Sequence, residues 1–200
     1  KFKYPIQYEK YRLVINAIII SIISVLIFAG VVAWRLYKAD DTSLFMYKIT
    51  QIIPARVGKI DGQPILFSDY LAYFRSSWNY HQTKEQKLEN QQAEDKLRSK
   101  YQQQAFQNAA KIAYAKKIAR EKNITVSRQE IEQELQQKLT YNNTKISLNS
   151  FDTIVKDYYG LTRDEYFKIF LEYPILLKKV VTEIDQKARQ IEQQVRNIIK

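Results

Sequence analysis

One unbroken apolar run near the start of the chain, Leu13 to Trp34, constrains the fold more than any other feature. Its side chains carry no charge, and the only polar ones belong to Asn16, Ser21 and Ser24. As an α-helix it spans roughly 33 Å, enough to cross a bilayer core of about 30 Å. We therefore predict a transmembrane anchor over residues 13–35, with the lipid bilayer as its partner.

The charges on either side of this run predict its direction across the membrane. Four basic residues precede it: Lys1, Lys3, Lys10 and Arg12. Two basic residues, Arg35 and Lys38, and two aspartates, Asp40 and Asp41, come after it. Because Lys and Arg accumulate on the cytoplasmic side, we predict a cytoplasmic segment over residues 1–12 and a body outside the cytoplasm. The chain would then be a single-pass protein of the plasma or inner membrane.

A cleaved signal peptide is the alternative interpretation of the same run. Such peptides have an apolar core of about 7–15 residues and a small-residue cleavage site. Here the apolar core is longer, and the best candidate site, at Val31 and Ala33, is followed by the bulky Trp34. These features favour an uncleaved anchor.

Composition excludes several classes of function. The net charge is +11, from 32 basic and 21 acidic residues, but no run of five or six like charges marks a nucleic-acid surface. The chain has no cysteine, which excludes thiol catalysis and cysteine-bound metals. His81, the only histidine, is predicted to lie on the surface at a helix end. We therefore expect no catalytic residue, no cofactor, no metal and no small-molecule substrate within residues 1–200.

The rest of the chain predicts a mainly α fold introduced by a small β-hairpin. Four Gly and four Pro in 200 residues favour long helices. After a connector over residues 36–53, a turn at Asp61 and Gly62 separates two expected strands, Arg56–Ile60 and Pro64–Leu66. The spacing of apolar residues then predicts helices over residues 68–81, 97–123, 127–140, 151–159, 162–173 and 175–199.

Local signals set the expected helix ends. Ser68 and Ser150 are expected N-caps, Ser127 and Thr162 open capping boxes with a Glu three residues later, and Gly160 ends a helix. Pro174 should kink or end the helix that contains it. Residues 83–96 have almost no apolar face and fit a solvated helix or a flexible loop, and residues 141–149 a polar loop.

Three motifs succeed one another in a recognisable order. They are an extended segment with an Asp-Gly turn at Val57–Ile65, an I-T-V-S-x-x-E-I helix start at Ile124–Ile131, and Y-G-L-T-x-x-E-Y at Tyr159–Tyr166. Together they resemble the N-terminal domain of SurA-type periplasmic chaperones and their anchored PpiD-like and PrsA-like relatives. The resemblance covers roughly residues 54–184, which we take as one helical chaperone domain.

This resemblance implies a function outside the cytoplasm. The family consists of holdases and foldases that bind unfolded or nascent secreted and membrane proteins. In many members a parvulin-type prolyl isomerase domain comes next, and residues 185–200 look like the connector helix that leads into it. We expect the chain to be a fragment, because it begins with Lys and stops within a helical pattern. Whether the whole protein is an enzyme then depends on whether a parvulin domain lies after Lys200.

Aromatic residues provide the candidate client-binding surface. Six of them crowd one short stretch: Tyr158, Tyr159, Tyr166, Phe167, Phe170 and Tyr173. Helical spacing places many of these in a core. The functional alternative is an adaptable apolar surface for client segments, since aromatic rings tolerate varied partners.

These features support three hypotheses, ranked by preference. The first is a membrane-tethered chaperone module that binds clients without covalent chemistry, and the second is the non-catalytic half of a prolyl isomerase. The third is an anchored helical scaffold of a cell-envelope assembly, built on residues 83–122 and 182–200. We rank the scaffold lower because we find no sustained heptads with charged flanks in either segment.

Overall fold

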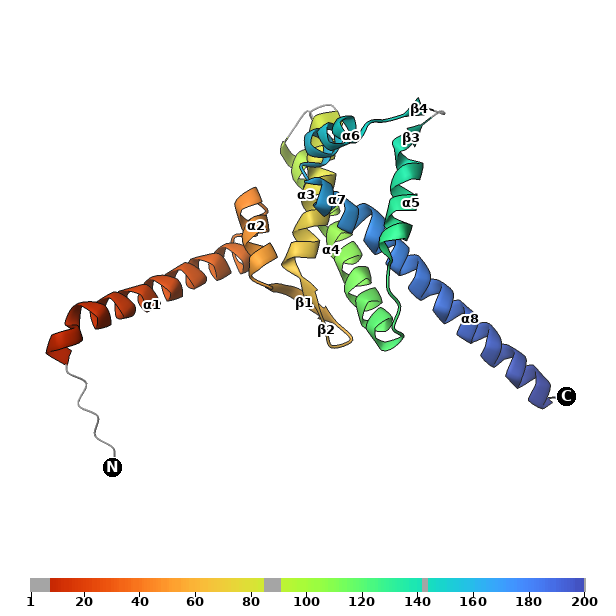
Figure 1. Cartoon of the computed structure of the whole chain (residues 1–200), viewed down its shortest axis with the longest axis horizontal. Helices are drawn as coiled ribbons and strands as arrows, with labels where there is room; N and C mark the ends of the chain where they lie inside the picture. Colours follow the sequence, from red (N-terminus) through yellow and green to blue (C-terminus); the bar gives the residue numbers. More distant parts are fainter. Residues whose placement is uncertain (1–7, 85–90, 142–143, 200) are drawn as a thin grey trace. The chain divides into compact units, whose positions relative to one another are not determined.

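The computed structural model describes residues 8–84, 91–141 and 144–199 (Figure 1). It divides into two compact units, residues 1–46 and residues 47–200. The fold class agrees with the prediction, because an N-terminal apolar helix and a two-stranded hairpin precede a helical domain with a long C-terminal helix.

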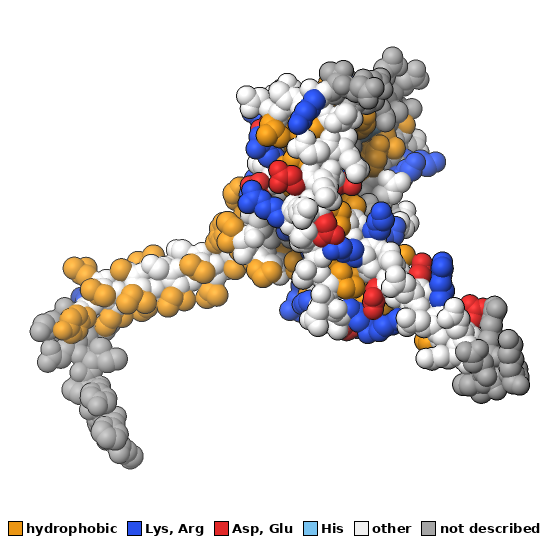
Figure 2. Space-filling model, turned by 45° about the vertical axis from the view of Figure 1, so that its right-hand side comes forward, with side chains coloured by type: hydrophobic (Ala, Val, Ile, Leu, Met, Phe, Trp, Pro, Cys, Tyr) orange, Lys and Arg blue, Asp and Glu red, His pale blue; other side chains and the backbone are white. Residues whose placement is uncertain are grey.

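The first unit contains helix α1, Tyr8–Tyr37, which includes the predicted anchor. Its segment Tyr11–Tyr37 contains an 18-residue window with a mean hydropathy of 2.7, and it is the one span among the described residues long and apolar enough to cross a membrane. Apolar side chains cover its length in Figure 2. The hydroxyls of Ser21 and Ser24 donate to the carbonyls of Ala17 and Ile20, at 2.8 and 2.9 Å. These bonds satisfy the polar groups without any water.

A short helix, α2, Leu44–Ile52, lies within the stretch expected to be a connector. The Ser43 hydroxyl accepts a hydrogen bond from the Met46 N–H at 3.3 Å, as an N-cap does. Pro54 follows two residues after the helix, and a proline disfavours helical backbone in the residue before it. This helix was not expected from the sequence, which predicts only a connector over residues 36–53.

The predicted hairpin is confirmed. Strand β1, Arg56–Ile60, pairs antiparallel with β2, Gln63–Leu66, and Ile60 lies opposite Gln63. Both turn residues have positive φ, 47° at Asp61 and 76° at Gly62, as a two-residue hairpin turn requires.

Helices α3, Phe67–Lys84, and α4, Gln91–Glu121, come after the hairpin. The prediction of Ser68 as the N-cap is wrong, because α3 begins at Phe67, whose N–H donates to the Ala55 carbonyl at 2.9 Å. The hairpin backbone therefore provides the partner that a capping side chain would supply. Of the stretch predicted as solvated helix or loop, residues 83–84 and 91–96 are helical, and residues 85–90 lie outside the described residues.

Helix α5, Arg128–Leu139, has the predicted capping box at Ser127. The expected loop after it instead contains a pair of two-residue strands, β3, Thr140–Tyr141, and β4, Thr144–Lys145. Helix α6, Leu148–Ile154, comes next. Its N-cap is Ser147 and not Ser150, because the Ser147 hydroxyl accepts a hydrogen bond from the Ser150 N–H at 3.1 Å.

Two π-helical turns interrupt the C-terminal helices. Helix α6 continues into η1, Val155–Tyr159, which ends as predicted at Gly160, with φ at 63°. The predicted capping box at Thr162 opens α7, Arg163–Phe167, which continues through η2, Lys168–Glu172, into α8, Tyr173–Ile199.

Pro174 does not end this helical run, contrary to one of the two expected outcomes. It is the second residue of α8, directly after the π turn Lys168–Glu172. The N–H of Tyr173 donates to the Lys168 carbonyl, five residues earlier. The wider π turn thus carries the backbone past the proline.

The core of the second unit lies between α3, α4 and the first half of α8. Ala115 and Ala119 of α4 pack with Leu176 and Val180 of α8. The small alanines let the two helices approach closely. The other buried apolar residues of these elements include Ile65, Tyr70, Leu71, Phe74, Ala109, Ile112 and Tyr173.

Candidate functional site

Rings from several elements of the second unit gather into one aromatic cluster. Its centre is Tyr159 of η1, Tyr166 of α7 and Phe170 of η2. The ring centroid of Tyr166 lies 4.8 Å from that of Phe170 and 5.6 Å from that of Tyr159. Tyr159 and Phe170 lie 5.4 Å apart, so all three pairs fall within the range of favourable aromatic contacts.

Three further rings extend the aromatic cluster on both sides. The Phe151 ring lies 5.2 Å from that of Tyr166 and 6.3 Å from that of Phe167. On the other side, Tyr80 of α3 stacks on Tyr159 at 5.5 Å and is 41% exposed. We define the aromatic cluster as Tyr80, Phe151, Tyr159, Tyr166, Phe167 and Phe170. The structure thus adds Tyr80 and Phe151 to four of the six predicted residues.

Partial burial raises the pKa of two cluster hydroxyls, which are neutral at physiological pH. Burial, followed by the neighbouring Tyr80 hydroxyl, raises the pKa of Tyr159. Burial, followed by Tyr159, raises the pKa of Tyr166. The half-buried rings therefore present an uncharged surface with polar edges, which suits apolar segments of varied sequence.

The other two predicted residues lie apart from this cluster. Tyr158 is half-buried, and the Lys84 ammonium lies 4.0 Å from its ring centroid. Tyr173 is only 1% exposed. In this structure Tyr173 belongs to the core of the domain.

Tyr173 joins three helices through a buried polar network. Its hydroxyl donates to Asp69 Oδ1 at 2.9 Å, and Lys116 Nζ donates to Asp69 Oδ2 at 2.9 Å. Lys116 also donates to the Tyr173 hydroxyl at 2.8 Å. Burial, followed by the charge of Asp69, raises the pKa of Tyr173 far above its usual range. The network therefore fixes α3, α4 and α8 to one another.

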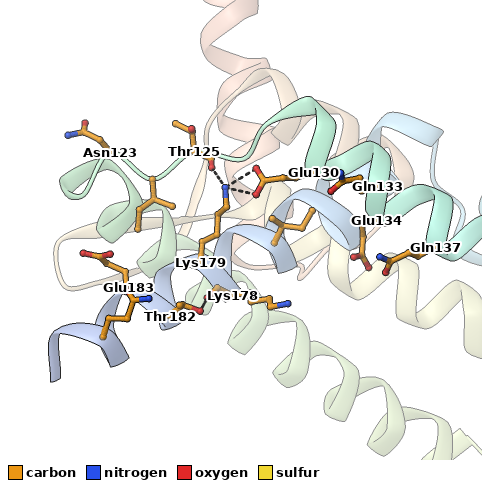
Figure 3. Close-up of a pocket in the computed structure, with 13 residues that line it drawn as sticks. Asn123, Thr125, Glu130, Gln133, Glu134, Gln137, Lys178, Lys179, Thr182 and Glu183 are labelled. Carbon is orange, nitrogen blue, oxygen red and sulfur yellow. Dashed lines mark hydrogen bonds and ion pairs between the residues drawn. The ribbon is translucent and has the colours of Figure 1, made fainter. Parts of the chain in front are cut away.

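A polar groove of about 650 Å³ runs between α5 and α8 (Figure 3). The stick view shows side chains from both helices facing it, with Gln133 and Gln137 on α5 and Thr182 and Glu183 on α8. Amide side chains can both donate and accept hydrogen bonds. The groove thus offers groups that match those of a polypeptide backbone.

An ion pair crosses one end of this groove. Lys179 Nζ lies 2.6 Å from Glu130 Oε1 and donates to the Thr125 carbonyl at 2.7 Å. Glu130 also accepts from the Ser127 N–H at 2.8 Å, within the capping box of α5. The Lys179 hydrogen bond, and then those from Ser127, lower the pKa of Glu130 to about 2.

A second carboxylate, Glu165, connects α2 to α7, a role that its capping-box motif does not indicate. It accepts hydrogen bonds at 2.7 Å from both Lys48 and Gln51, in addition to the Thr162 N–H at 2.8 Å. Burial opposes ionisation, but these hydrogen bonds outweigh it and hold the pKa of Glu165 at about 2. Lys48 and Gln51 are three residues apart, so they lie on one face of α2. A prediction of α2 as a helix would have placed these two side chains together, where one carboxylate can accept from both.

The prediction that His81 lies on the surface is wrong. It is 6% exposed, and its ring lies 5.5 Å from Trp78 and 5.9 Å from Tyr101. The reason is that α3 continues to Lys84, which keeps His81 within the helix and against α4. Across the described ranges, no group of three His, Cys, Asp or Glu side chains could hold a metal ion.

Comparison with protein families identifies this arrangement. A family model described as a SurA-like N-terminal domain matches residues 6–181, which include α1 as well as the body. No match is found among curated proteins or solved structures. The chain therefore belongs to the SurA-like N-terminal domain family, whose members are chaperone-like, folding-related modules.

Proposed function

We propose that the chain is a membrane-anchored chaperone module that binds unfolded secreted or membrane proteins outside the cytoplasm. The observation that carries this proposal is the family match, because it extends over the apolar helix and the helical body together. Binding is reversible and involves no covalent chemistry.

The aromatic cluster is the surface that best suits client contact. Phe151 is buried, but Tyr159, Tyr166, Phe167 and Phe170 are half-buried. The cluster lies at two π-helical turns, which occur often at functional sites. Tyr80, at 41% exposed, extends this surface to solvent. Apolar client segments would lie against the rings, while the tyrosine hydroxyls remain solvated or bonded to client backbone.

The anchor supports this function because it keeps the module close to clients at the membrane. A module held at the membrane by α1 meets emerging or membrane-bound clients at a raised effective concentration. The proposed direction rests on the Lys and Arg count, four before the span and two after it.

A client-aggregation assay tests the proposal. The chain is reconstituted in lipid nanodiscs and added to a chemically unfolded secreted protein that aggregates on dilution, with empty nanodiscs as the control. We expect light scattering to fall as the chain approaches an equimolar ratio. Scattering that matches the empty nanodiscs at every ratio would overturn the proposal.

A further inference from the structure

The second half of α8 carries an apolar stripe that no other described element covers. In the first half, Leu176 and Val180 are buried against α4. Helix α4 ends at Glu121, whereas α8 continues to Ile199. Beyond that contact, Val181, Ile184 and Ile191 are 49%, 47% and 61% exposed.

The residues of this stripe have a heptad pattern. Val181, Ile184, Ala188 and Ile191 are separated by steps of three, four and three residues, and the sequence continues the steps with Val195 and Ile198. These are the a and d positions of a coiled coil, with Val181 at a and Ile184 at d. Gln186, which lines the groove beside α5, falls on the opposite face of the helix.

The structure separates this pattern from the core of the domain. In the sequence, Leu177 keeps the same spacing, four residues before Val181, whereas Val180 lies outside the repeat. From Val181 to Ile198 the repeat covers only about two and a half heptads, fewer than a sequence pattern needs to predict a coiled coil. Val180 is 3% exposed and packs inside the chain's own domain. The apolar residues that remain from Val181 onward keep the three–four spacing, with charged residues beside them.

Those flanking charges favour a parallel partner. With Val181 at position a, Asp185 and Glu192 occupy e positions and Lys187 a g position. In a parallel pair, a g residue faces the e residue of the next heptad in the other helix, which places Lys187 opposite Glu192. An antiparallel pair would bring e positions together and set acidic residues against one another.

The surroundings of Lys187 add to this preference. Its Nζ lies 3.9 Å from Glu183 Oε1 on its own helix. The nearby Lys122 side chain lowers the pKa of Lys187. A second carboxylate beside Lys187 would offset the repulsion between these two ammonium groups.

We propose that α8 pairs in parallel with α8 of a second copy of this chain along residues 184–194. The pairing does not depend on client binding. A parallel pair is compatible with two copies whose anchors cross one membrane in the same direction. Two joined modules would present two aromatic clusters to one client, which strengthens binding by avidity.

Single-cysteine cross-linking of the full chain in lipid vesicles tests the proposal, since the chain has no cysteine of its own. Ala188→Cys at position a should form a disulfide-linked dimer under mild oxidation. Gln186→Cys, equally exposed but on the opposite face, is the matched control and should cross-link several-fold less. Equal extents for the two variants, or no dimer from Ala188→Cys, would refute the pairing.

Two further variants test whether the paired α8 helices run parallel or antiparallel. Ile184→Cys and Ile191→Cys should each cross-link when present alone, because a parallel pair sets identical positions side by side. If the two link only when mixed, the helices run antiparallel and the proposal fails.

Charge reversal tests the register in the Ala188→Cys background. Lys187→Glu or Glu192→Lys alone should lower the dimer fraction, and the double variant should restore it. A double variant no better than either single one would contradict the pairing of these residues. Circular dichroism of each variant verifies that the helical content is unchanged, and client aggregation is measured separately.

Discussion

Lys179 of α8 and Glu130 of α5 lie 2.6 Å apart between Nζ and Oε1, and the same carboxylate completes the capping box of α5. One side chain therefore both begins α5 and attaches it to α8 (Figure 3). Lys179 also donates to the Thr125 carbonyl, just before the helix. The start of α5 and one end of the polar groove thus depend on the same group of contacts.

Ser127→Ala should destabilise the second unit by removing this cap. The Ser127 hydroxyl accepts from the Glu130 N–H at 3.3 Å and donates to Glu130 Oε2 at 2.9 Å. Loss of a serine N-cap costs about 1 kcal/mol, which corresponds to a fall in Tm of about 2–4 °C in a domain of this size. Ser99→Ala, on the exposed face of α4, is the control and should leave Tm unchanged in the same thermal unfolding measurement.

Glu165→Gln should make stability less dependent on acid pH. The folded pKa of Glu165 is about 2, below its ordinary value of 4.5. Ionised Glu165 therefore stabilises the folded state above pH 4.5, and this contribution is lost as the pH falls toward 2. We expect the variant to have a lower Tm than the parent chain at pH 7 and a Tm close to it at pH 2.

Thermal unfolding followed by circular dichroism from pH 7 to pH 2 measures this difference. Glu132→Gln, an exposed glutamate on α5, is the matched control and should match the parent chain throughout. A Tm difference for Glu165→Gln that stays constant over the whole range would show that the ionised carboxylate is not its source.

Tyr173→Phe should lower the free energy of unfolding by more than the removal of one oxygen atom suggests. The change removes the donor to Asp69 Oδ1 and the acceptor for Lys116 in a site that is almost fully buried. Leaving buried polar groups unsatisfied costs about 1–3 kcal/mol. Tyr159→Phe, which keeps its ring contacts in the half-buried cluster, should cost much less. Denaturant unfolding of both variants gives the comparison, and equal losses would contradict a structural role for the network.

Local signals in the sequence predicted those parts of the fold that a few neighbouring residues determine. The Asp61-Gly62 turn and the capping boxes at Ser127 and Thr162 each form within four residues, so their residue types suffice. Ser147 and Ser150 both suit an N-cap by residue type, and it is the Ser147 hydroxyl that accepts a hydrogen bond, from the Ser150 N–H.

Contacts between distant residues could not be predicted in this way. Lys48 and Glu165 are 117 residues apart, and their pairing needs both α2 and α7 in place. Tyr80 and Tyr159 stack because α3 and η1 are neighbours, which no sequence spacing indicates. Tertiary packing places four of the six predicted aromatics in the cluster, Tyr173 in the core and Tyr158 beside Lys84.

The topology of the anchor can be tested in the same cysteine-free background. Gln7→Cys precedes the span, and Gln103→Cys lies on an exposed position of α4. In intact cells, a membrane-impermeant maleimide should label Gln103→Cys and spare Gln7→Cys until the cells are lysed. The reverse pattern would place the N-terminus outside and the body in the cytoplasm. If neither variant is labelled before lysis, both the N-terminus and the body lie in the cytoplasm.

Tyr80→Ser should weaken client binding if the aromatic cluster is the contact surface. Tyr80 is 41% exposed and stacks on Tyr159, so its loss removes apolar area from the cluster with little effect on the core. Tyr114 of α4 is 39% exposed and outside the cluster, which makes Tyr114→Ser a control of equal chemistry and similar exposure. In the nanodisc aggregation assay, we expect Tyr80→Ser to need several-fold more chain for the same suppression and Tyr114→Ser to match the parent. Equal losses in the two variants would indicate that general surface hydrophobicity, and not the cluster, holds the client.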